Sequence, residues 1–332
     1  MKVQQLVRSG MIAAAFACAL AVAIPAAVQA EEAVQVDKNI GKYVKTKGVD
    51  GNLNSIGSDT LNNLMTYWAE GFRKQYPNVN IQIEGKGSST APPALIEGTA
   101  QLAPMSRPMK KEEIEKFEAK HGYKPTQIGV ALDSLAVFVN KDNPLNELTL
   151  DQVDAIFSKN RKRGAAQDVV TWSQLGLTGS LGARPLSIYG RNSASGTYGF
   201  FKEHALKKGD YKDTVKEQPG SASVVLGVTE DLAGIGYSGI GYKTSGVKAL
   251  ALGEKPGAKI YAPTYENVLE GKYPLGRLLY IYVAKKPNQP LSPLVKEFLK
   301  YALSQEGQEI VVKDGYLPLT AEIAKKQLDI LE

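Results

Sequence analysis

The stretch Arg191-Asn192-Ser193-Ala194-Ser195-Gly196-Thr197 joins a short apolar segment at 185–190 to an amphipathic segment at 198–206. The first segment predicts a β-strand and the second a helix, so the loop between them ends at a helix N-terminus. The free N–H groups and partial positive charge there favour anions. Ser195 and Thr197 add hydroxyl donors, and Arg191 adds a planar guanidinium that suits a tetrahedral oxyanion. The loop predicts an anion site, although an ordinary Ser/Thr helix cap beside a surface arginine would look the same.

Three earlier segments repeat this strand, loop and helix pattern, at 53–76, 79–96 and 100–120. Their loops also offer Ser, Thr, Gly or Arg at a predicted helix N-terminus, and none has the spacing of a nucleotide-binding loop. Alternating strands and helices predict a mostly parallel sheet, in which ligands bind outside the carboxyl ends of the strands. We therefore predict that the four loops converge on one anion.

Two long apolar segments, 128–140 and 275–283, predict buried strands that cross from one lobe to another. About 300 residues is also more than one compact core usually holds. The predicted fold is α/β with two lobes, a mostly parallel sheet in each, and a ligand cleft between them. The predicted first lobe is residues 51–130 plus 284–332, and the second is residues 131–283.

Residues 1–30 have the features of a cleavable export signal, with Lys2 and Arg8 before an apolar stretch at 11–23 and small residues up to Ala30. The only cysteine, Cys18, falls inside this segment. Residues 31–50 are polar without a clear period, and we interpret them as an N-terminal extension. Since no long apolar segment follows residue 30, the sequence predicts an exported protein with no membrane span.

The charge pattern argues against nucleic acid as a partner. Removal of residues 1–30 would lower the formal net charge from +6 to +4, and the remaining lysines are scattered between carboxylates. Residues 159–163 form the one basic cluster, which we interpret as a solvated loop.

Catalysis is also not expected from the sequence. The two histidines, His121 and His204, fall on charged faces of predicted helices, and no Asp/His cluster has metal-ligand spacing. The Gly-x-Ser-x-Gly motif of a nucleophile elbow is also absent, because residues 236–240 match it except for isoleucine in place of the last glycine. We predict a binding protein that needs no metal or other cofactor, against the alternative of a secreted phosphatase.

Taken together, the motifs resemble those of the phosphate-binding proteins of bacterial phosphate ABC transporters. The resemblance covers residues 53–320 and depends on the order and spacing of motifs at 57–61, 87–89, 105–108, 132–137, 191–197, 303–308 and 315–319. It implies a type II periplasmic binding protein that closes two lobes on one inorganic phosphate. It further implies a periplasmic location, a permease in the inner membrane with a cytoplasmic ATPase, and a monomer.

The resemblance also implies a set of ligand residues. Each would give a backbone N–H, a hydroxyl or a guanidinium: Thr60, Leu61, Ser88, Ser106, Arg191, Ser195, Gly196 and Thr197.

The sequence departs from the family pattern after the third strand. Family members place an aspartate there, which accepts the proton of hydrogen phosphate, whereas this chain has Ser106 and Arg107. Asp59 or Asp133 would then have to supply the carboxylate, and Ser89 and Arg107 are further candidate ligands. The departure keeps open a receptor for another tetrahedral oxyanion. A secreted scaffold or adhesive protein that binds phosphate, located outside the cell, is the other alternative.

Overall fold

The computed structural model describes residues 34–332. The predicted export signal at 1–30, with Cys18, lies outside the described residues, as do the first three residues of the predicted extension. None of the helices within 34–332 is long and apolar enough to cross a membrane.

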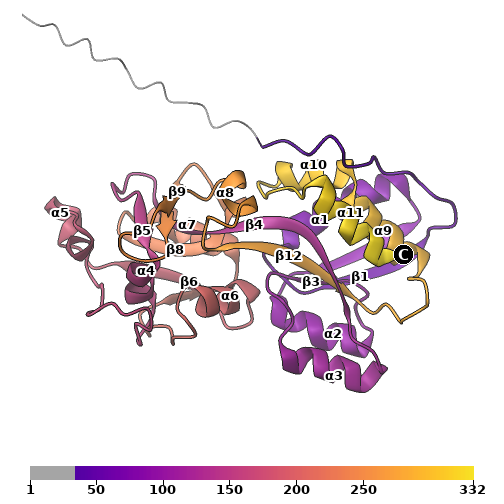
Figure 1. Cartoon of the computed structure of the whole chain (residues 1–332), viewed down its shortest axis with the longest axis horizontal. Helices are drawn as coiled ribbons and strands as arrows, with labels where there is room; N and C mark the ends of the chain where they lie inside the picture. Colours follow the sequence, from indigo (N-terminus) through magenta and orange to yellow (C-terminus); the bar gives the residue numbers. More distant parts are fainter. Residues whose placement is uncertain (1–33) are drawn as a thin grey trace, which may run out of the picture. The chain divides into compact units, whose positions relative to one another are not determined.

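The first lobe contains the three predicted strand-loop-helix units and the C-terminal helices (Figure 1). Helix α1 buries Leu64, Met65, Trp68 and Phe72 along one face, as its helical spacing predicts. Strands β1 and β2 pair in parallel. The elements of this lobe are β1 (Gly51–Ile56), α1 (Asn62–Gln75), β2 (Val79–Glu84), α2 (Ala91–Glu97), β3 (Ala103–Met105), α3 (Lys111–His121), α9 (Pro293–Leu303), α10 (Gln305–Lys313) and α11 (Ala321–Leu331).

The second lobe surrounds the strand and helix that flank the Arg191 loop. Strand β6 pairs in parallel with β7 on one side and with β8 on the other. Its elements are β5 (Glu147–Thr149), α4 (Leu150–Phe157), α5 (Gly179–Gly182), β6 (Ser187–Arg191), α6 (Gly196–His204), β7 (Lys216–Gln218), α7 (Ser221–Glu230), β8 (Gly234–Gly239), β9 (Val247–Ala249), β10 (Ala251–Gly253), β11 (Ile260–Tyr261) and α8 (Tyr265–Leu269).

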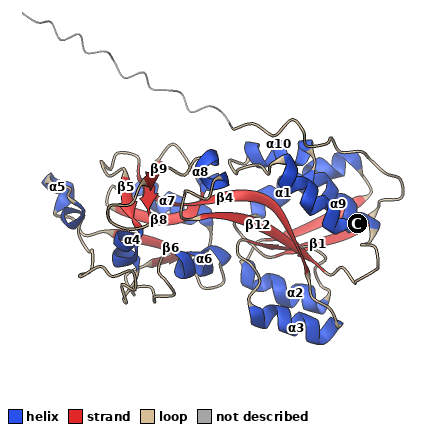
Figure 2. Cartoon of the chain, in the orientation of Figure 1, coloured by secondary structure: helices blue, strands red, loops and turns tan. Residues whose placement is uncertain are grey.

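Strands β4 (Thr126–Asn140) and β12 (Gly276–Val283) join the two lobes, as their apolar sequences predict. They pair with each other from Gly276 opposite Ser134 to Val283 opposite Thr126. Strand β3 of the first lobe adds to β12, and β8 and β9 of the second lobe add to the far half of β4. One sheet of seven strands therefore runs through both lobes, with helices packed around it (Figure 2).

The expectation of mostly parallel sheets needs correction, because the sheets are mixed. Pairing is parallel between the strands of repeated strand-helix units, such as β1 with β2 and β6 with β8. Every pair that involves β4 or β12 is antiparallel. For β4 with β12 the reason is topological: the chain crosses between lobes once in each direction, so the two crossing strands run opposite to each other.

The predicted lobe boundaries at 130/131 and 283/284 remain a prediction. The first falls inside β4. The second falls at the end of β12, although residues Tyr280–Tyr282 of that strand already pair with β3 of the first lobe.

Residues 34–50 form no helix or strand but pack along the first lobe. Tyr43 donates its backbone N–H to Glu306 at 2.8 Å and its hydroxyl to Glu297 at 2.7 Å. The side chains of Ile40 and Val49 are buried. This part of the predicted extension is therefore tied to the C-terminal helices.

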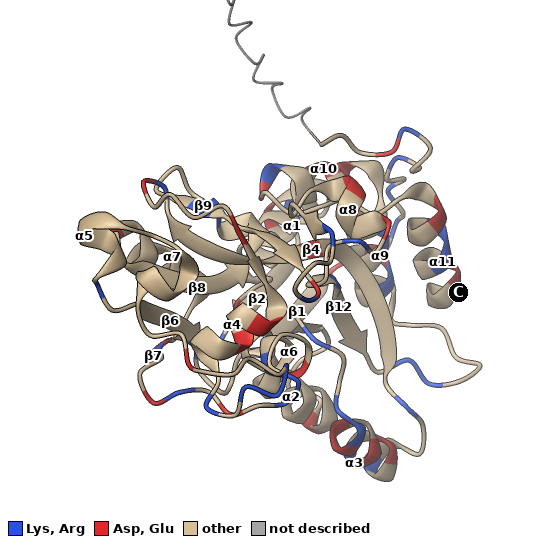
Figure 3. Ribbon diagram, turned by 60° about the vertical axis from the view of Figure 1, so that its left-hand side comes forward, with Lys and Arg blue, Asp and Glu red and all other residues tan. Residues whose placement is uncertain are grey.

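Three of the four basic residues in the cluster at 159–163 pair with nearby carboxylates, and the fourth, Lys162, donates to the carbonyl of Lys208. Lys159 pairs with Asp213 at 2.7 Å, Arg161 pairs with Asp168, and Arg163 pairs with Glu254 at 2.9 Å. Figure 3 shows basic and acidic residues interspersed along the ribbon, for example on α3. Arg163 is largely buried, so the interpretation of the cluster as a wholly solvated loop was wrong for this residue.

One carboxylate at the end of α10 is held in an unfavourable setting. The Oδ2 atom of Asp314 is buried and has no hydrogen-bond partner among the described residues. Burial raises the pKa of Asp314 to about 7. The carboxyl group therefore binds its proton more tightly in the folded chain than in the unfolded chain. The stabilisation that this gives is complete below about pH 4, near the unfolded pKa, and is lost as the pH rises through the folded pKa of about 7.

We expect Asp314→Asn to remove this pH dependence. Relative to the variant, the wild-type free energy of unfolding should fall by roughly 1–2 kcal/mol between pH 4 and pH 8, a value reduced from the full shift because the residue is partly exposed. Urea unfolding at several pH values measures the difference. Asp329→Asn, at an exposed position on α11, is the control. Parallel wild-type and Asp314→Asn curves would contradict the prediction.

Candidate functional site

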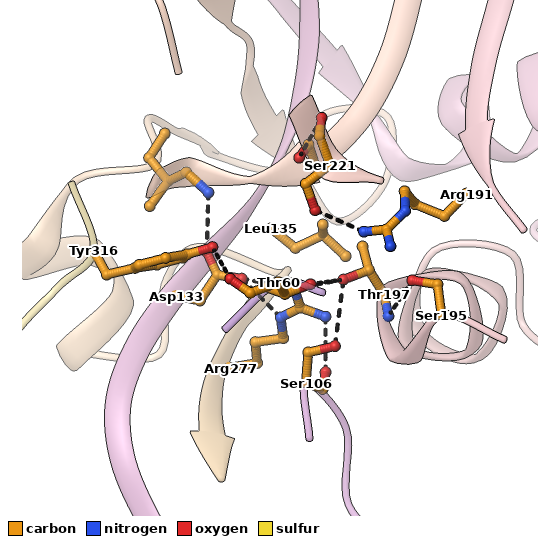
Figure 4. Close-up of polar contacts among 12 residues, drawn as sticks. Thr60, Ser106, Asp133, Leu135, Arg191, Ser195, Thr197, Ser221, Arg277 and Tyr316 are labelled. Atoms are coloured by element: carbon orange, nitrogen blue, oxygen red, sulfur yellow. Dashed lines mark hydrogen bonds and ion pairs between the residues drawn. The ribbon is translucent and has the colours of Figure 1, made fainter. Parts of the chain in front are cut away.

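The four predicted loops meet where β4 and β12 pass between the lobes. Figure 4 shows Thr60, Ser106 and Thr197 from three of these loops beside Asp133 and Arg277 of the two strands. Each loop follows a strand and leads into a helix, which brings the strand ends and helix starts to one point. The loop after β6 comes from the second lobe and the other three come from the first. Ser89 of the first lobe donates its backbone N–H to the carbonyl of Ala194 at 3.0 Å, so the two lobes are in direct contact here.

A cluster of buried hydroxyl groups forms the centre of the site. Thr60 Oγ1 lies 2.9 Å from Thr197 Oγ1, and Ser88 Oγ lies 3.2 Å from Ser106 Oγ. Ser106 Oγ is in turn 3.5 Å from Thr197 Oγ1. These four side chains have exposed fractions of 0–1%, so residues from four separate loops share one buried volume.

Hydroxyl groups in and beside this cluster accept hydrogen bonds from N–H groups and keep their own hydrogens to donate. Ser88 Oγ accepts the backbone N–H of Ser106, and Ser195 Oγ accepts the N–H groups of Thr197 and Tyr198 as the N-cap of α6. A hydroxyl oxygen that accepts such bonds still has its own hydrogen to donate. The cluster is therefore rich in donors, which matches the needs of an oxyanion.

Gly196 allows the loops of the two lobes to approach this closely. A Cβ atom at this position would lie 2.2 Å from Ser88 Oγ and 2.6 Å from Ser106 Oγ. Gly87, which has a φ of 124°, is similar, since its Cβ would lie 2.5 Å from the carbonyl of Ala194. Both positions require glycine because the opposite lobe occupies the space of a side chain.

Arg191 is 1% exposed and is held at the edge of the cluster. Its Nη1 donates to Ser221 Oγ at 2.6 Å, and its Nη2 lies 3.0 Å from Asp59 Oδ2. Burial lowers the pKa of the Arg191 guanidinium from its ordinary value, whereas the carboxylate of Asp59 acts in the opposite direction. Its buried Nε has no hydrogen-bond partner within residues 34–332, and a buried donor of this kind is well suited to a ligand.

A second buried arginine, Arg277 of β12, was missed from the sequence. It donates to Asp133 Oδ2 from Nε at 2.9 Å and from Nη2 at 2.7 Å. It also donates to the Ser106 carbonyl at 2.8 Å and to Thr197 Oγ1 at 2.9 Å. The sequence did contain a signal for it, a lone arginine inside an otherwise apolar crossing strand. Such an arginine indicates a specific buried partner, because a charge is seldom buried without one.

The remaining candidates from the sequence lie near the cluster in different roles. The carboxylate of Asp133 is fully buried and bonded to Arg277 and to the N–H of Ile240. Arg107 points to Glu113, which it contacts through two hydrogen bonds of 2.8 and 2.7 Å, and so braces its own loop. Leu61 is buried at the start of α1.

A cavity of about 510 Å³ lies beside the cluster, between the two lobes. Ser89 and Ser195, from two of the four predicted loops, form part of its wall. Its basic lining residues are Arg107, Lys110, Lys202 and Lys208, and its acidic one is Glu203. The cavity gives an anion a predominantly basic approach to the loops.

Within residues 34–332, no group of three His, Cys, Asp or Glu side chains is placed to hold a metal ion. The arrangement offers hydroxyls, a helix N-terminus and a guanidinium around a buried point. Such a donor set can bind a tetrahedral oxyanion without coordinating a cation.

Comparison with known proteins gives the family of this chain. A family profile described as the PBP superfamily domain matches residues 44–306. The phosphate-binding protein PstS of Pseudomonas aeruginosa is 58% identical over 306 residues, which cover 92% of this chain and 95% of that protein. The protein SphX of Synechococcus elongatus is 32% identical over 270 residues, which cover 80% and 77% of the two chains.

Solved structures agree with the fold. A protein from Clostridium perfringens, described as a phosphate ABC transporter substrate-binding protein with bound phosphate, has a TM-score of 0.67 and 27% identity. The alignment covers 81% of this chain and all of that one. An ABC-type phosphate transport receptor from Vibrio cholerae has a TM-score of 0.62 at 23% identity over 80% of this chain and all of the other, which supports the fold alone.

These matches confirm the resemblance found in the motifs and the two-lobed α/β fold of type II. The relatives are named as binding proteins rather than enzymes, in agreement with the prediction of a binding protein. By its motifs, its fold and a 58% identical relative, the chain belongs to the PstS-like phosphate-binding proteins of the PBP superfamily.

Proposed function

We propose that the chain binds inorganic phosphate between its two lobes. The observation that carries the proposal is the convergence of donors from four loops on one buried point, together with the Arg191 Nε, which has no hydrogen-bond partner in the described part of the chain. The proposed ligand groups are those of Thr60, Leu61, Ser88, Ser106, Arg191, Ser195, Gly196 and Thr197. Relatives that share most of the chain are named phosphate-binding proteins, which supports this choice of anion.

Hydrogen bonds, more than net charge, would provide the affinity. The two arginines beside the hydroxyl cluster are each paired with a carboxylate, Arg191 with Asp59 and Arg277 with Asp133, so the two pairs are together neutral. A buried hydrogen bond to a charged ligand is worth about 1.5–3 kcal/mol. Several such bonds, together with the N-terminus of α6, can offset the desolvation of an anion.

Ser106 bears on the choice between oxyanions. Its hydroxyl lies within 3.5 Å of the Ser88 and Thr197 hydroxyls, and its direction is not imposed by a backbone donor. It can therefore accept the proton of hydrogen phosphate or donate to a fully deprotonated anion such as sulfate. Because a serine does not repel sulfate as an aspartate would, a receptor for other tetrahedral oxyanions is the second candidate function.

The family context supports a role in phosphate import. We propose that the exported chain acts as a monomer in the periplasm and delivers phosphate to an inner-membrane permease driven by a cytoplasmic ATPase. A secreted phosphate-binding scaffold would instead be found outside the cell. Loss of the gene should slow growth on limiting phosphate under the import proposal and leave it unchanged under the scaffold alternative.

The direct test is calorimetric titration of the protein, freed of bound anions by unfolding and refolding, with phosphate, arsenate and sulfate. We expect micromolar or tighter binding of phosphate. Arg191→Ala should weaken it at least tenfold, because a guanidinium at the site is lost, whereas Arg73→Ala, at an exposed position in the last turn of α1, should change it less than threefold. No phosphate binding by the folded wild-type chain would refute the proposed function.

Closure can be tested at Gly196. Gly196→Ala should reduce phosphate affinity at least a hundredfold, because the added methyl group would overlap Ser88 and Ser106 of the opposite lobe and hold the lobes apart. Gly199→Ala on the same helix is the matched control, since its Cβ would lie 3.4 Å from Arg107 Cδ, an ordinary contact. If the two variants bound phosphate with equal affinity in the same titration, Gly196 would not lie this close to Ser88 and Ser106 in the bound state.

Ser106→Asp should sharpen the preference for phosphate over sulfate. A carboxylate at this buried position would accept the proton of hydrogen phosphate and repel a fully deprotonated anion. The dissociation constant for sulfate divided by that for phosphate should therefore rise at least tenfold. Competition between the two anions at neutral pH measures the ratio. If the ratio does not change in a folded variant, Ser106 does not contact the ligand.

A further inference from the structure

We propose that Asp59 is a latch between the lobes that positions Arg191, rather than a ligand of the anion. The inference rests on the proposed function for its effect on phosphate binding, but the latch itself consists of contacts between protein atoms. Asp59 follows β1 in the first lobe, and its carboxylate reaches the second lobe, where Oδ2 accepts the N–H of Ser221 at 2.9 Å and its hydroxyl at 3.0 Å.

The carboxylate caps a helix that has no cap of its own. Ser221 is the first residue of α7, a helix of 10 residues whose N-cap is Gly220 and whose first turn has no acidic residue. By contrast, α6 is capped by its own Ser195 and α10 by its own Ser304. A Cβ on Gly220 would lie 3.1 Å from Asp59 Oδ1, so glycine leaves room for the carboxylate of the other lobe. The cap is therefore supplied between lobes.

The same carboxylate fixes the proposed ligand arginine. Asp59 Oδ2 lies 3.0 Å from Arg191 Nη2, and Ser221 Oγ accepts a bond from Arg191 Nη1 at 2.6 Å. The arginine also donates to the carbonyl of Pro219 at 3.3 Å. Asp59 and Ser221 thus hold the guanidinium from two sides (Figure 4 shows the bond between Arg191 and Ser221).

The backbone of Asp59 is held by the second lobe as well. Tyr242 donates its hydroxyl to the Asp59 carbonyl at 2.9 Å. The next residue, Thr60, contacts Thr197 of the second lobe through its hydroxyl. Both the side chain and the main chain at Asp59 therefore connect the lobes immediately beside the proposed anion site.

These contacts can form only when the lobes are together, so they stabilise the closed arrangement over an open one. The observed affinity of an anion that binds between the lobes depends on the population of that arrangement. A carboxylate near an anion site would by itself repel the ligand. Because Asp59 is compensated by Arg191 and by the N-terminus of α7, we expect the gain in closure to exceed this repulsion.

The experiment measures closure without phosphate and binding kinetics with it. Spin labels at Lys111→Cys and Asp213→Cys, in a chain with Cys18→Ser, report the distance between the lobes. Asp59→Ala should shift the ligand-free distance distribution towards longer values. It should also raise the phosphate dissociation rate at least tenfold, while the association rate changes less than threefold.

Matched variants separate the latch from a general structural role. Asp59→Asn keeps an acceptor for Ser221 but loses the charge, so its effect should be intermediate. The double variant Asp59→Ala with Ser221→Ala should dissociate phosphate about as fast as Asp59→Ala alone, because both changes break one network. Asp142→Asn, at an exposed ion pair with Lys141, is the control and should resemble the wild type.

Two results would overturn the proposal. The first is an unchanged ligand-free distance distribution in folded Asp59→Ala and Asp59→Asn. The second is tighter phosphate binding in Asp59→Asn, which would mean that repulsion by the carboxylate dominates. The distance measurement involves no anion, so failure of the latch is distinguishable from failure of the proposed function, which the wild-type titration tests.

Discussion

The buried ion pair between Asp133 of β4 and Arg277 of β12 connects the two strands that join the lobes. Asp133 is fully buried and Arg277 is 6% exposed, a setting in which charges are costly unless their hydrogen bonds are satisfied. Here Asp133 also accepts the N–H of Ile240, and Arg277 reaches Ser106 of the first lobe and Thr197 of the second. The relative positions of the loops that carry Ser106 and Thr197 therefore depend on a pair that lies in the crossing strands themselves.

The site built on this pair uses dipoles in preference to unpaired charge. Its two arginines are each compensated by a carboxylate, and the hydroxyls of Ser88, Ser195 and Thr197 have partners that leave their hydrogens free to donate. An anion in such a site is recognised by the direction of donors held in place before binding. This arrangement is consistent with a member of the phosphate-binding family, and under the proposed function the affinity for phosphate depends on how completely the lobes close.

Much of the site could be predicted because its residues lie close together in the sequence. A strand, a loop of small polar residues and a helix start are local features, and their repetition predicts convergence once an α/β sheet is assumed. Arg277 was not predicted, because its partners Asp133 and Ser106 are far away in the sequence. The pairing of Asp59 with α7, and of Arg107 with Glu113, also could not be assigned, since an aspartate or arginine in a polar loop has the same local pattern whichever way it points.

The elements could be predicted before the structure was known: the four loops, the two crossing strands and the family motifs depend on local propensity and periodicity. Three features became visible only in the folded chain: the crossing strands are antiparallel neighbours, Gly196 must lack a side chain, and Asp59 caps a helix of the opposite lobe. The physical reason is that register, steric exclusion and pairing of buried charges arise between segments distant in the chain, where no local pattern specifies the partner.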